Sequence, residues 1–413
     1  MGHLSGDRSP RRSVVAVLGL AVVLAGCGGS GPTPPATASS PQATATVGSS
    51  LASGSAGPSL TTGSPPSPTP SAAGDRWRLV PLPDSADAGI VADIAARPGL
   101  VVAVGSAGQA AELGVAWTST DQGSTWVREP LPGPAGPARV VPWGRRVLVT
   151  GTGQGPDCAH PSIVRAWVRA ASGDWRAAPF DPIFCVGGAP AAATLDGHAV
   201  IAGVGSGDVG YAWSSDAGLT WQDRSTALGE RAPRGVTVDG QGFAMLETSA
   251  ATSEAWVTRS ADGTTWSPPA PLSGLPAGSN VKEPITVDGA VAIFVADTTG
   301  SMRVYRVDPA GGWRSTAVDG LRGDTLARIV AVEGGLVALG GDDAGPSAWA
   351  SADGVTWRAV ARPGEVVAAG SGATLTGAAV EAGRAFLVGQ VPTASGDRAI
   401  GALWDGPATL LAP

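Results

Sequence analysis

The chain has 413 residues and a net charge of −7, and it contains 61 glycines and 35 prolines. Glycine and proline at this density interrupt helical periodicity, which excludes a helical bundle and favours an all-β fold. The acidic balance, with dispersed basic residues and a single lysine, Lys282, excludes nucleic acid as a partner.

The N-terminal segment predicts export. Arg8, Arg11 and Arg12 precede an uninterrupted apolar stretch over residues 14–25, which is too short for a stable membrane span and typical of a signal peptide. The stretch ends in the letters LAGC, with Cys27 last. This ending resembles the bacterial lipobox, in which the cysteine is lipidated and becomes the new N-terminus. The resemblance implies a lipoprotein signal peptide at 1–26 and an anchor on the outer face of the cell membrane. An ordinary secretory signal is the alternative, and either the general or the twin-arginine route could export the chain.

Residues 27–74 predict a disordered tether. After Cys27 the segment is almost entirely Gly, Ser, Thr, Pro and Ala, and no charge occurs before Asp75. Such a composition cannot bury enough apolar surface to offset the entropy of ordering. We therefore expect a spacer that holds the following domain away from the membrane. The composition of the whole chain also suggests a GC-rich actinobacterial source.

Tryptophan recurs along the rest of the chain at intervals of 44 to 49 residues. This period predicts propeller blades or a solenoid. The recurring residues are Trp77, Trp126, Trp175, Trp221, Trp266, Trp313 and Trp357. A second aromatic stands on the preceding strand of most repeats, at Trp117, Trp167, Trp213, Trp256, Tyr305, Trp349 and Trp404. Rings repeated this regularly favour burial between adjacent sheets over sugar binding.

The segments between the tryptophans predict four short strands per repeat, the content of a propeller blade. Residues 75–82 read as an outermost strand with no blade before it. At the other end, 373–380, 384–388 and 399–404 supply three strands. Together they make one blade. The sequence therefore predicts a seven-bladed β-propeller over 75–413, built of four-stranded antiparallel blades, whose last blade is closed by the N-terminal strand. Six blades with unpaired ends is the alternative.

A turn motif precedes four of the marker tryptophans. It reads STDQGSTW at 119–126, SSDAGLTW at 214–221, SADGTTW at 260–266 and SADGVTW at 351–357. The aspartate can accept turn N–H groups, and the glycine supplies a positive φ. The motif resembles the Asp box, or bacterial neuraminidase repeat, of sialidase-like propellers. In that family the box joins the third and fourth strands of a blade and serves structure. The resemblance implies a bracing role for Asp121, Asp216, Asp262 and Asp353, with Trp126, Trp221, Trp266 and Trp357 pinning the turns.

Two cysteines remain after lipidation. Cys158 falls in a loop between a second and a third strand, and Cys185 falls in a connection between blades. Both kinds of segment open on one face, so a disulfide between them is expected in an exported protein. Metal binding by the pair with His160 is the alternative, but a tetrahedral site would lack a ligand. We therefore expect no metal and no cofactor.

Polar residues on the same face are candidate ligand contacts. They are Asp157, His160, Asp181, Asp208, Asp342 and Asp343, together with Glu112 and Glu254. A glycosidase needs two carboxylates that converge. Whether any of these side chains converge cannot be read from the sequence, and solvated loop charges are the alternative explanation for each.

The resemblance also names an enzyme to test for. Sialidases use an arginine triad, whose first member lies in an R-I-P motif, with a tyrosine nucleophile, a glutamate and an aspartate. No R-I-P occurs here, and the tyrosines are Tyr211 and Tyr305, so no catalytic residue carries over. Non-enzymatic relatives include photosystem II assembly factors and sortilin-type receptors. We therefore predict a monomeric, surface-anchored binding or scaffold module, whose partner is an envelope protein or an extracellular ligand such as a glycan. A divergent glycoside hydrolase is the alternative.

Overall fold

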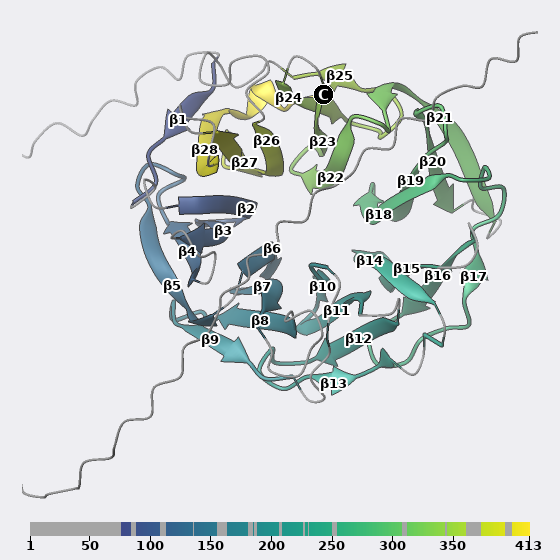
Figure 1. The fold of residues 1–413 in the computed structure, drawn as a ribbon, viewed down its shortest axis with the longest axis horizontal. Coiled ribbons are helices and arrows are strands. Elements are labelled where there is room, and N and C mark those ends of the chain that lie inside the picture. The colour runs from purple at the N-terminus through teal and green to yellow at the C-terminus, as the bar shows by residue number, and fades with distance from the viewer. Residues whose placement is uncertain are drawn as a thin grey trace, which may run out of the picture. The chain divides into compact units, whose positions relative to one another are not determined.

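The computed structural model describes residues 76–83, 88–107, 113–134, 136–154, 163–180, 185, 188–205, 209–225, 228–229, 231–249, 254–307, 312–342, 345–360, 373–392 and 399–413. The predicted signal peptide and tether lie outside these residues. The described chain is almost entirely β-structure, and its strands form seven four-stranded sheets arranged in a ring (Figure 1). The prediction of an all-β, seven-bladed propeller is confirmed.

The first three blades follow one another in the chain, and each is a sheet of four consecutive antiparallel strands. Blade 1 consists of β2 (Ala88–Arg97), β3 (Leu100–Ala107), β4 (Leu113–Ser119) and β5 (Val127–Pro134). Blade 2 consists of β6 (Gly136–Trp143), β7 (Arg146–Gly153), β8 (Ile163–Arg169) and β9 (Trp175–Ala178). Blade 3 consists of β10 (Ala191–Leu195), β11 (His198–Val204), β12 (Gly210–Ser215) and β13 (Gln222–Asp223).

Blades 4 to 6 repeat this order. Blade 4 consists of β14 (Ala232–Asp239), β15 (Gly242–Thr248), β16 (Ala255–Ser260) and β17 (Ala270–Pro271). Blade 5 consists of β18 (Asn280–Val287), β19 (Ala290–Ala296), β20 (Ser301–Val307) and β21 (Trp313–Arg322). Blade 6 consists of β22 (Leu326–Val332), β23 (Gly335–Asp342), β24 (Gly345–Ser351) and β25 (Arg358–Ala359).

Blade 7 joins the two ends of the domain, as predicted. It consists of β26 (Thr374–Glu381), β27 (Arg384–Pro392), β28 (Ala399–Pro407) and, from the start of the domain, β1 (Arg78–Val80). In Figure 1 the purple β1 lies beside the yellow β28. Leu79 pairs with Trp404, and the guanidinium of Arg78 donates to both carboxylate oxygens of Asp405 at 3.0 and 2.8 Å. A short 3₁₀ turn, η3 (Ala408–Leu410), follows.

The hydrophobic core is divided into seven clusters, one between each pair of neighbouring blades. The third-strand aromatics lie at these interfaces, and Trp117, Trp167, Trp213 and Trp404 are fully buried. Trp117 and Trp167 each donate an indole N–H to a backbone carbonyl, of Pro83 at 3.2 Å and Pro132 at 2.9 Å. The Tyr305 hydroxyl donates to the carbonyl of Gly274 at 2.8 Å. Tyrosine can replace tryptophan at this position because it too is an apolar ring with one donor.

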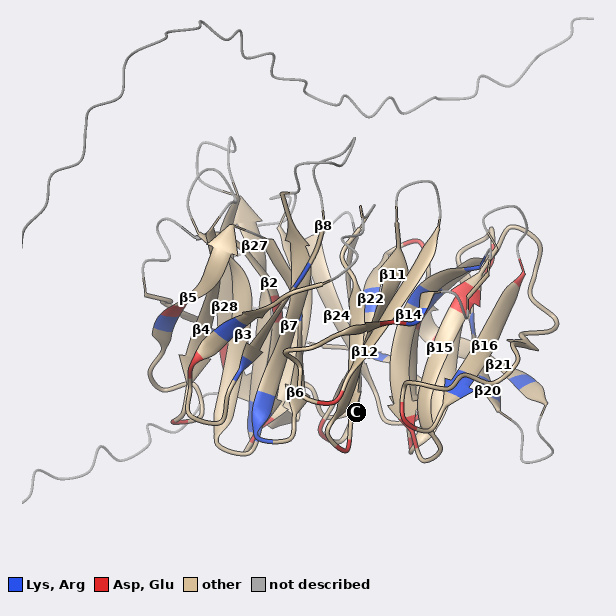
Figure 2. Cartoon of the chain, turned by 90° about the horizontal axis from the view of Figure 1, so that it is seen from below, with Lys and Arg blue, Asp and Glu red and all other residues tan. Residues whose placement is uncertain are grey.

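The innermost strands face a central channel, and they are β2, β6, β10, β14, β18, β22 and β26 (Figure 1). Each inner strand begins at the face where one blade connects to the next, and we call this the connection face. Each ends at the opposite face, which carries the first hairpin and the Asp-containing turn of the blade, and we call this the turn face. Figure 2 shows acidic turns in red along the lower edge of the ring.

Candidate functional site

The Asp-containing turn of blade 1 joins β4 to β5 and is held by one carboxylate. Asp121 accepts the Ser119 hydroxyl at 2.8 Å, and the Thr125 N–H and hydroxyl at 2.8 and 2.6 Å. The Ser119 hydroxyl in turn accepts the Gly123 N–H at 2.7 Å. Trp126 closes the turn by donating its indole N–H to the carbonyl of Gly123 at 3.2 Å. Partial burial raises the pKa of Asp121, but hydrogen bonds from Thr125, Ser119 and Ser124 outweigh it and lower the pKa to about 2.

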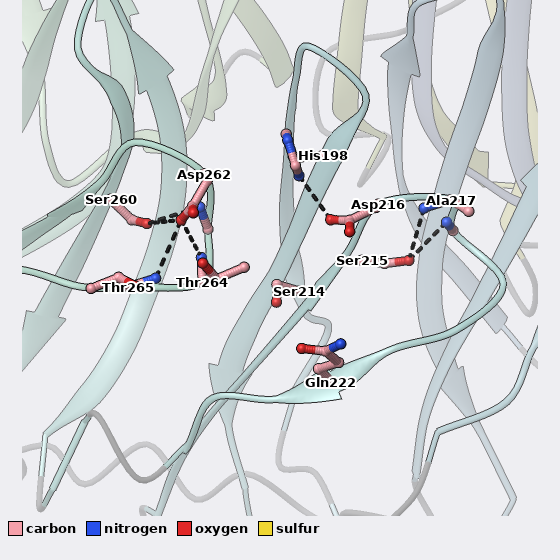
Figure 3. Close-up of polar contacts among 12 residues, drawn as sticks. His198, Ser214, Ser215, Asp216, Ala217, Gln222, Ser260, Asp262, Thr264 and Thr265 are labelled. Carbon is pink, nitrogen blue, oxygen red and sulfur yellow. Dashed lines mark hydrogen bonds and ion pairs between the residues drawn. The ribbon is translucent and has the colours of Figure 1, made fainter.

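The turns of blades 4 and 6 use the same scheme. Asp262 accepts the N–H groups of Thr264 and Thr265 and the Ser260 hydroxyl (Figure 3). Asp353 accepts N–H groups from Val355 and Thr356 and the hydroxyl of Ser351. These hydrogen bonds hold the pKa of both carboxyl groups below the usual range. Three of the four aspartates therefore brace their turns.

The bracing role predicted for Asp216 is wrong. In blade 3 the serine that accepts the glycine N–H is Ser215, which receives Gly218 N at 2.8 Å, and Ser214 lies one position too early. This register puts Ala217 where the other turns have aspartate. Asp216 turns outward, with its side chain 76% exposed, and meets Nδ1 of His198 at 2.8 Å (Figure 3). The sequence SSDAG allows either serine to align with the motif, and the turn adopts the shorter spacing of blades 4 and 6.

Each turn glycine is packed against a side chain of the preceding blade. A Cβ atom on Gly123 would lie 2.4 Å from the ring of Phe386, and one on Gly218 would lie 2.4 Å from the ring of Trp143. This contact explains Trp143, the one tryptophan outside the repeat. Both glycines have a positive φ, +80° in each case. The turn face is therefore a packed, structural surface.

The predicted ligand-binding residues fall mostly outside the described residues. These are Asp157, His160, Asp181, Asp208 and Asp343. Asp342 is the last residue of β23, and its side chain is not described. Whether they form a site stays a prediction.

The cysteine assignments are tested only in part. Cys185 is disulfide-bonded and forms an isolated β-bridge with Ile163, at the start of β8. Its predicted partner Cys158 lies outside the described residues, as does Cys27, so the pairing and the lipidation stay predictions.

The central channel holds a cavity of about 760 Å³. Residues from the inner strands of all seven blades line it, most of them Ala, Val, Ile and Pro. Four charged side chains interrupt this apolar lining in the half nearer the connection face, and we call them the channel quartet. They are Asp93 on β2, Arg139 on β6, Glu283 on β18 and Arg328 on β22.

Asp93 and Arg328 form an ion pair across the channel. Arg328 Nη1 donates to Asp93 Oδ1 at 2.7 Å and Nη2 donates to Oδ2 at 3.3 Å. Asp93 also accepts the N–H groups of Ile94 and Val140, at 3.0 and 3.1 Å. Arg328 Nη1 further donates to the carbonyl of Thr376 at 3.2 Å. The pair therefore links blades 1, 2, 6 and 7. Despite the desolvation that lowers it, the Asp93 charge raises the pKa of Arg328.

The second pair of the quartet joins blades 2 and 5. Arg139 Nη2 donates to Glu283 Oε1 at 2.5 Å. The Glu283 side chain is 43% exposed, whereas Asp93 is 3% exposed. The Glu283 charge also acts on Arg328, because it adds to the rise in the pKa of that arginine. The four side chains thus form one charge network.

A smaller cavity of about 230 Å³ adjoins the channel between blades 4, 5 and 6. It shares Glu283, Arg328 and Ile329 with the larger cavity, and it adds Arg234 and Lys282. Burial lowers the pKa of Lys282. Lys282 Nζ donates to the carbonyl of Leu326 at 3.2 Å, and Arg234 Nε donates to the Thr248 hydroxyl at 2.9 Å.

The turn-face end of the channel is different. Glu381 accepts the N–H of Gly99 at 3.0 Å, and Arg97 donates to the carbonyls of Pro98 and Arg145. Burial and the charges of Arg169 and Arg145 lower the pKa of Arg97. These contacts hold the hairpins in place.

Sequence reasoning missed the channel charges because it looked for function in loops. What these residues share is a bulge near the start of the inner strand, which the strand register of the structure reveals. Six of the seven inner strands show a register shift there, and β10 pairs without one. Bulges redirect side chains and recur beside active sites. Facing glycines leave room for them: a Cβ atom on Gly105 would lie 1.9 Å from the carbonyl oxygen of Ile90 in β2, and one on Gly340 would lie 2.0 Å from that of Thr325, directly before β22.

Neither tyrosine faces the channel as a nucleophile would. Tyr211 and Tyr305 are buried between blades, and burial raises the pKa of Tyr211. Within the described chain, no group of three or more His, Cys, Asp or Glu side chains could hold a metal ion. The described part also contains no helix long and apolar enough to span a membrane.

Comparisons with known proteins identify the fold and no family. No protein-family model matches the chain, and no curated protein matches it. A solved prolyl endopeptidase is 17% identical, with a TM-score of 0.53, and the match covers 80% of this chain and 51% of that one. A Trypanosoma rangeli sialidase in complex with sialic acid is 12% identical, with a TM-score of 0.44, over 78% of this chain and 54% of that one. A Fusarium graminearum α-L-arabinofuranosidase is 11% identical, with a TM-score of 0.44, over 78% of this chain and 94% of that one.

The chain spans about half the length of the endopeptidase and of the sialidase. At these identities the likeness to the endopeptidase shows a shared propeller fold, and the lower scores of the other two add no argument. Function therefore has to be argued from the site.

Proposed function

We propose that this protein is an exported binding module, held at the membrane by a lipid on Cys27, that captures its ligand in the central channel without catalysis. The observation that carries the proposal is the state of the carboxylate in the channel quartet. Asp93 accepts four hydrogen bonds, from two backbone N–H groups and both Nη atoms of Arg328. A carboxylate offers about four lone-pair sites, so Asp93 has none left for a substrate.

This occupancy weighs against the glycoside hydrolase alternative. A glycosidase needs one carboxylic acid to donate a proton and a second carboxylate as nucleophile or base. In the described part of the channel's connection half, the other carboxylate is Glu283, and Arg139 holds it. The quartet therefore fixes the positions of its own side chains and leaves no carboxylate free for proton transfer. An apolar lining with a few convergent polar groups is typical of a ligand pocket.

The turn motif and the N-terminal segment support the remaining parts of the proposal. Three turns carry the aspartate brace expected of Asp-box propellers, which favours membership of that group. The lipobox-like sequence before Cys27 and the Ser/Thr/Pro/Gly-rich segment after it are what a surface lipoprotein would need. The partner is then an envelope protein or an extracellular ligand.

The test is ligand capture by the full-length chain with its channel filled. Ala331 lines the channel and is exposed, so the bulky ring of Ala331→Trp should obstruct the channel without disturbing the core. Ala317, exposed on the outer strand β21, provides the matched control Ala317→Trp. Affinity capture from the native envelope should enrich the same ligand with the wild type and Ala317→Trp, and lose it with Ala331→Trp. Equal capture by all three would overturn the channel as the binding site.

The enzyme alternative is tested with the same three proteins. Fluorogenic sialosides and other glycosides should not be turned over by any of them. Turnover by the wild type that Ala331→Trp abolishes and Ala317→Trp retains would replace the binding-module proposal with the hydrolase.

Anchoring is tested by Cys27→Ser. This variant should appear in the medium, whereas the wild type should fractionate with the membrane. Unchanged membrane fractionation of Cys27→Ser would refute the lipid anchor.

A further inference from the structure

We infer that the small cavity between blades 4, 5 and 6 is an anion subsite, in which Arg234 and Lys282 bind a carboxylate or phosphate group of the ligand. The inference rests on the proposed function, because it names the chemistry of the ligand that the channel captures. It is carried by three observations: unused hydrogen-bond donors, a local excess of positive charge, and a cavity of suitable size and position.

The donors are available on two side chains. A lysine ammonium has three N–H donors and a guanidinium has five. Lys282 uses one, for the carbonyl of Leu326, and Arg234 uses its Nε–H for Thr248. The two Nη atoms of Arg234 make no hydrogen bond within the described chain. An oxyanion that entered the cavity would therefore meet donors that folding has not consumed.

The charge balance favours an anion. The channel quartet and the small cavity together hold four cationic side chains, Arg139, Arg234, Lys282 and Arg328, against the carboxylates Asp93 and Glu283. The net local charge is +2, in a chain whose net charge is −7. Asp93 and Glu283 are already paired with Arg328 and Arg139. Arg234 and Lys282 therefore provide the uncompensated charge.

Bulges in three inner strands bring the charged residues of the two cavities together. Arg234 is the extra residue of the β14 bulge, Lys282 and Glu283 lie in the β18 bulge, and Arg328 directly follows the β22 bulge. Three adjacent inner strands thus turn charged side chains toward one place, where a regular strand would alternate them between faces. The side chains stand on strands and not on loops, which favours a fixed geometry.

Partial desolvation strengthens the subsite. Lys282 is half-buried, and burial lowers its pKa, so its ammonium lacks part of its hydration shell. An anion would restore that lost interaction, and attraction between charges is larger in a partly buried site than in water. Arg234 is exposed at the cavity and can supply a planar fork for two oxygens of one group.

The two cavities together describe the ligand. The small cavity, about 230 Å³, is large enough for one oxyanion group, and it adjoins the 760 Å³ channel, with which it shares the lining residues Glu283, Arg328 and Ile329. The channel lining beyond is mostly Ala, Val, Ile and Pro. We therefore expect a ligand with an anionic head in the small cavity and a less polar body along the channel.

The experiment is a calorimetric titration of the purified full-length chain, with inorganic phosphate in one series and acetate in another. The wild type should bind at least one of the two anions, and the affinity should fall as sodium chloride is raised. The double variant Arg234→Gln/Lys282→Gln should bind about a hundredfold more weakly, at about tenfold for each of the two charge-assisted hydrogen bonds that it loses. The preferred anion identifies the head group as a phosphate or a carboxylate.

Two further variants make the result specific. Arg303→Gln is the matched control, because Arg303 lies on β20 and bonds to the Ser315 hydroxyl away from both cavities, and it should bind like the wild type. Ala327→Trp should block the small cavity by bulk alone, since Ala327 lines it and is exposed, and it should abolish binding while all the charges remain. Equal binding by the wild type, the double variant and Ala327→Trp would overturn the subsite, as would no binding of either anion by the wild type.

A failure of the anion subsite can be distinguished from a failure of the channel as the ligand-binding site. If Ala331→Trp loses the native ligand but neither anion binds the wild type, the channel is the binding site and the anion subsite is wrong. If the anions bind as described but Ala331→Trp still captures the native ligand, the subsite stands and the channel is not where that ligand binds.

Discussion

The two ends of the blades differ in how closely their residues repeat from one blade to the next. At the turn face, blades 1, 4 and 6 hold the same kind of turn with the same carboxylate, and a neighbouring side chain packs on each turn glycine. In the connection half of the channel, equivalent positions carry Asp93, Arg139, Gly235, Glu283 and Arg328. What repeats from blade to blade stabilises the fold, whereas what differs between blades can recognise one ligand in one orientation.

The largest expected effect tests whether the channel charges also carry stability. Asp93→Ala leaves Arg328 without its partner and strips an acceptor from the Val140 N–H. We expect the free energy of unfolding to fall by about 3–5 kcal/mol, the usual result of breaking a buried ion pair. Urea denaturation measures it. The control is Asp324→Ala, which removes the exposed pair with Arg322 and should lower the free energy of unfolding far less, because exposed ion pairs contribute little to stability. Equal costs would mean that the channel pair is no more than a surface contact.

The next effect tests the packing of the turn face. In Gly123→Ala the new methyl group would overlap the Phe386 ring at a positive φ, so we expect a loss of about 1–2 kcal/mol from the backbone and about 1–3 kcal/mol from overpacking. Gly99→Ala is the matched control, because Gly99 has a φ of +75° and open space around its Cα, and only the backbone cost should remain. Urea denaturation of the two variants measures the difference. Equal denaturation midpoints would contradict the tight packing of Phe386 on Gly123.

A smaller effect separates a bracing aspartate from one that only resembles it. Asp262→Ala removes an acceptor of two turn N–H groups and one hydroxyl, and should cost about 1 kcal/mol. Asp216→Ala removes an exposed contact with His198 and should change stability by less than about 0.5 kcal/mol. Thermal melting of both variants decides the point. A larger loss for Asp216→Ala would restore it as a brace.

The smallest effect is a pH dependence of the same turns. The folded-state pKa of Asp121 is about 2, below the ~3.9 of an unfolded chain. A depressed pKa contributes stability that is fully present above the unfolded value and is lost as pH falls through the folded value. The stability advantage of the wild type over Asp121→Asn should therefore shrink between pH 5 and about pH 2. Melting points across that range test it, and an advantage that does not change with pH would contradict the brace.

Much of the fold could be read from the sequence because the repeat states it many times. The spacing of the tryptophans gave the blade length, and the unpaired strand around Trp77 gave the closure with Trp404, which the structure confirms. Even the substitution of Tyr305 for tryptophan kept the register, since both side chains fill the interface and donate one hydrogen bond.

The channel could not be read in the same way. A charge such as Arg139 or Glu283 within an apolar strand looks like a solvent-facing position, because its partner lies 144 residues away in the sequence. Only ring closure brings blades 2 and 5 face to face. The wrong prediction of a bracing role for Asp216 has a local cause. Two adjacent serines allow two alignments of the turn motif, and which serine accepts the glycine N–H depends on turn length and on packing against Trp143.

The most direct test of the central claim is a crystal structure of the protein grown with selenate, whose anomalous scattering locates the anion. The strongest anomalous peak should lie in the small cavity, within hydrogen-bonding distance of Arg234 and Lys282 and beside the channel quartet. Peaks found only at other arginines, such as Arg303 or Arg322, with the cavity between blades 4, 5 and 6 empty, would contradict the assignment of Arg234 and Lys282 as an anion subsite beside the channel.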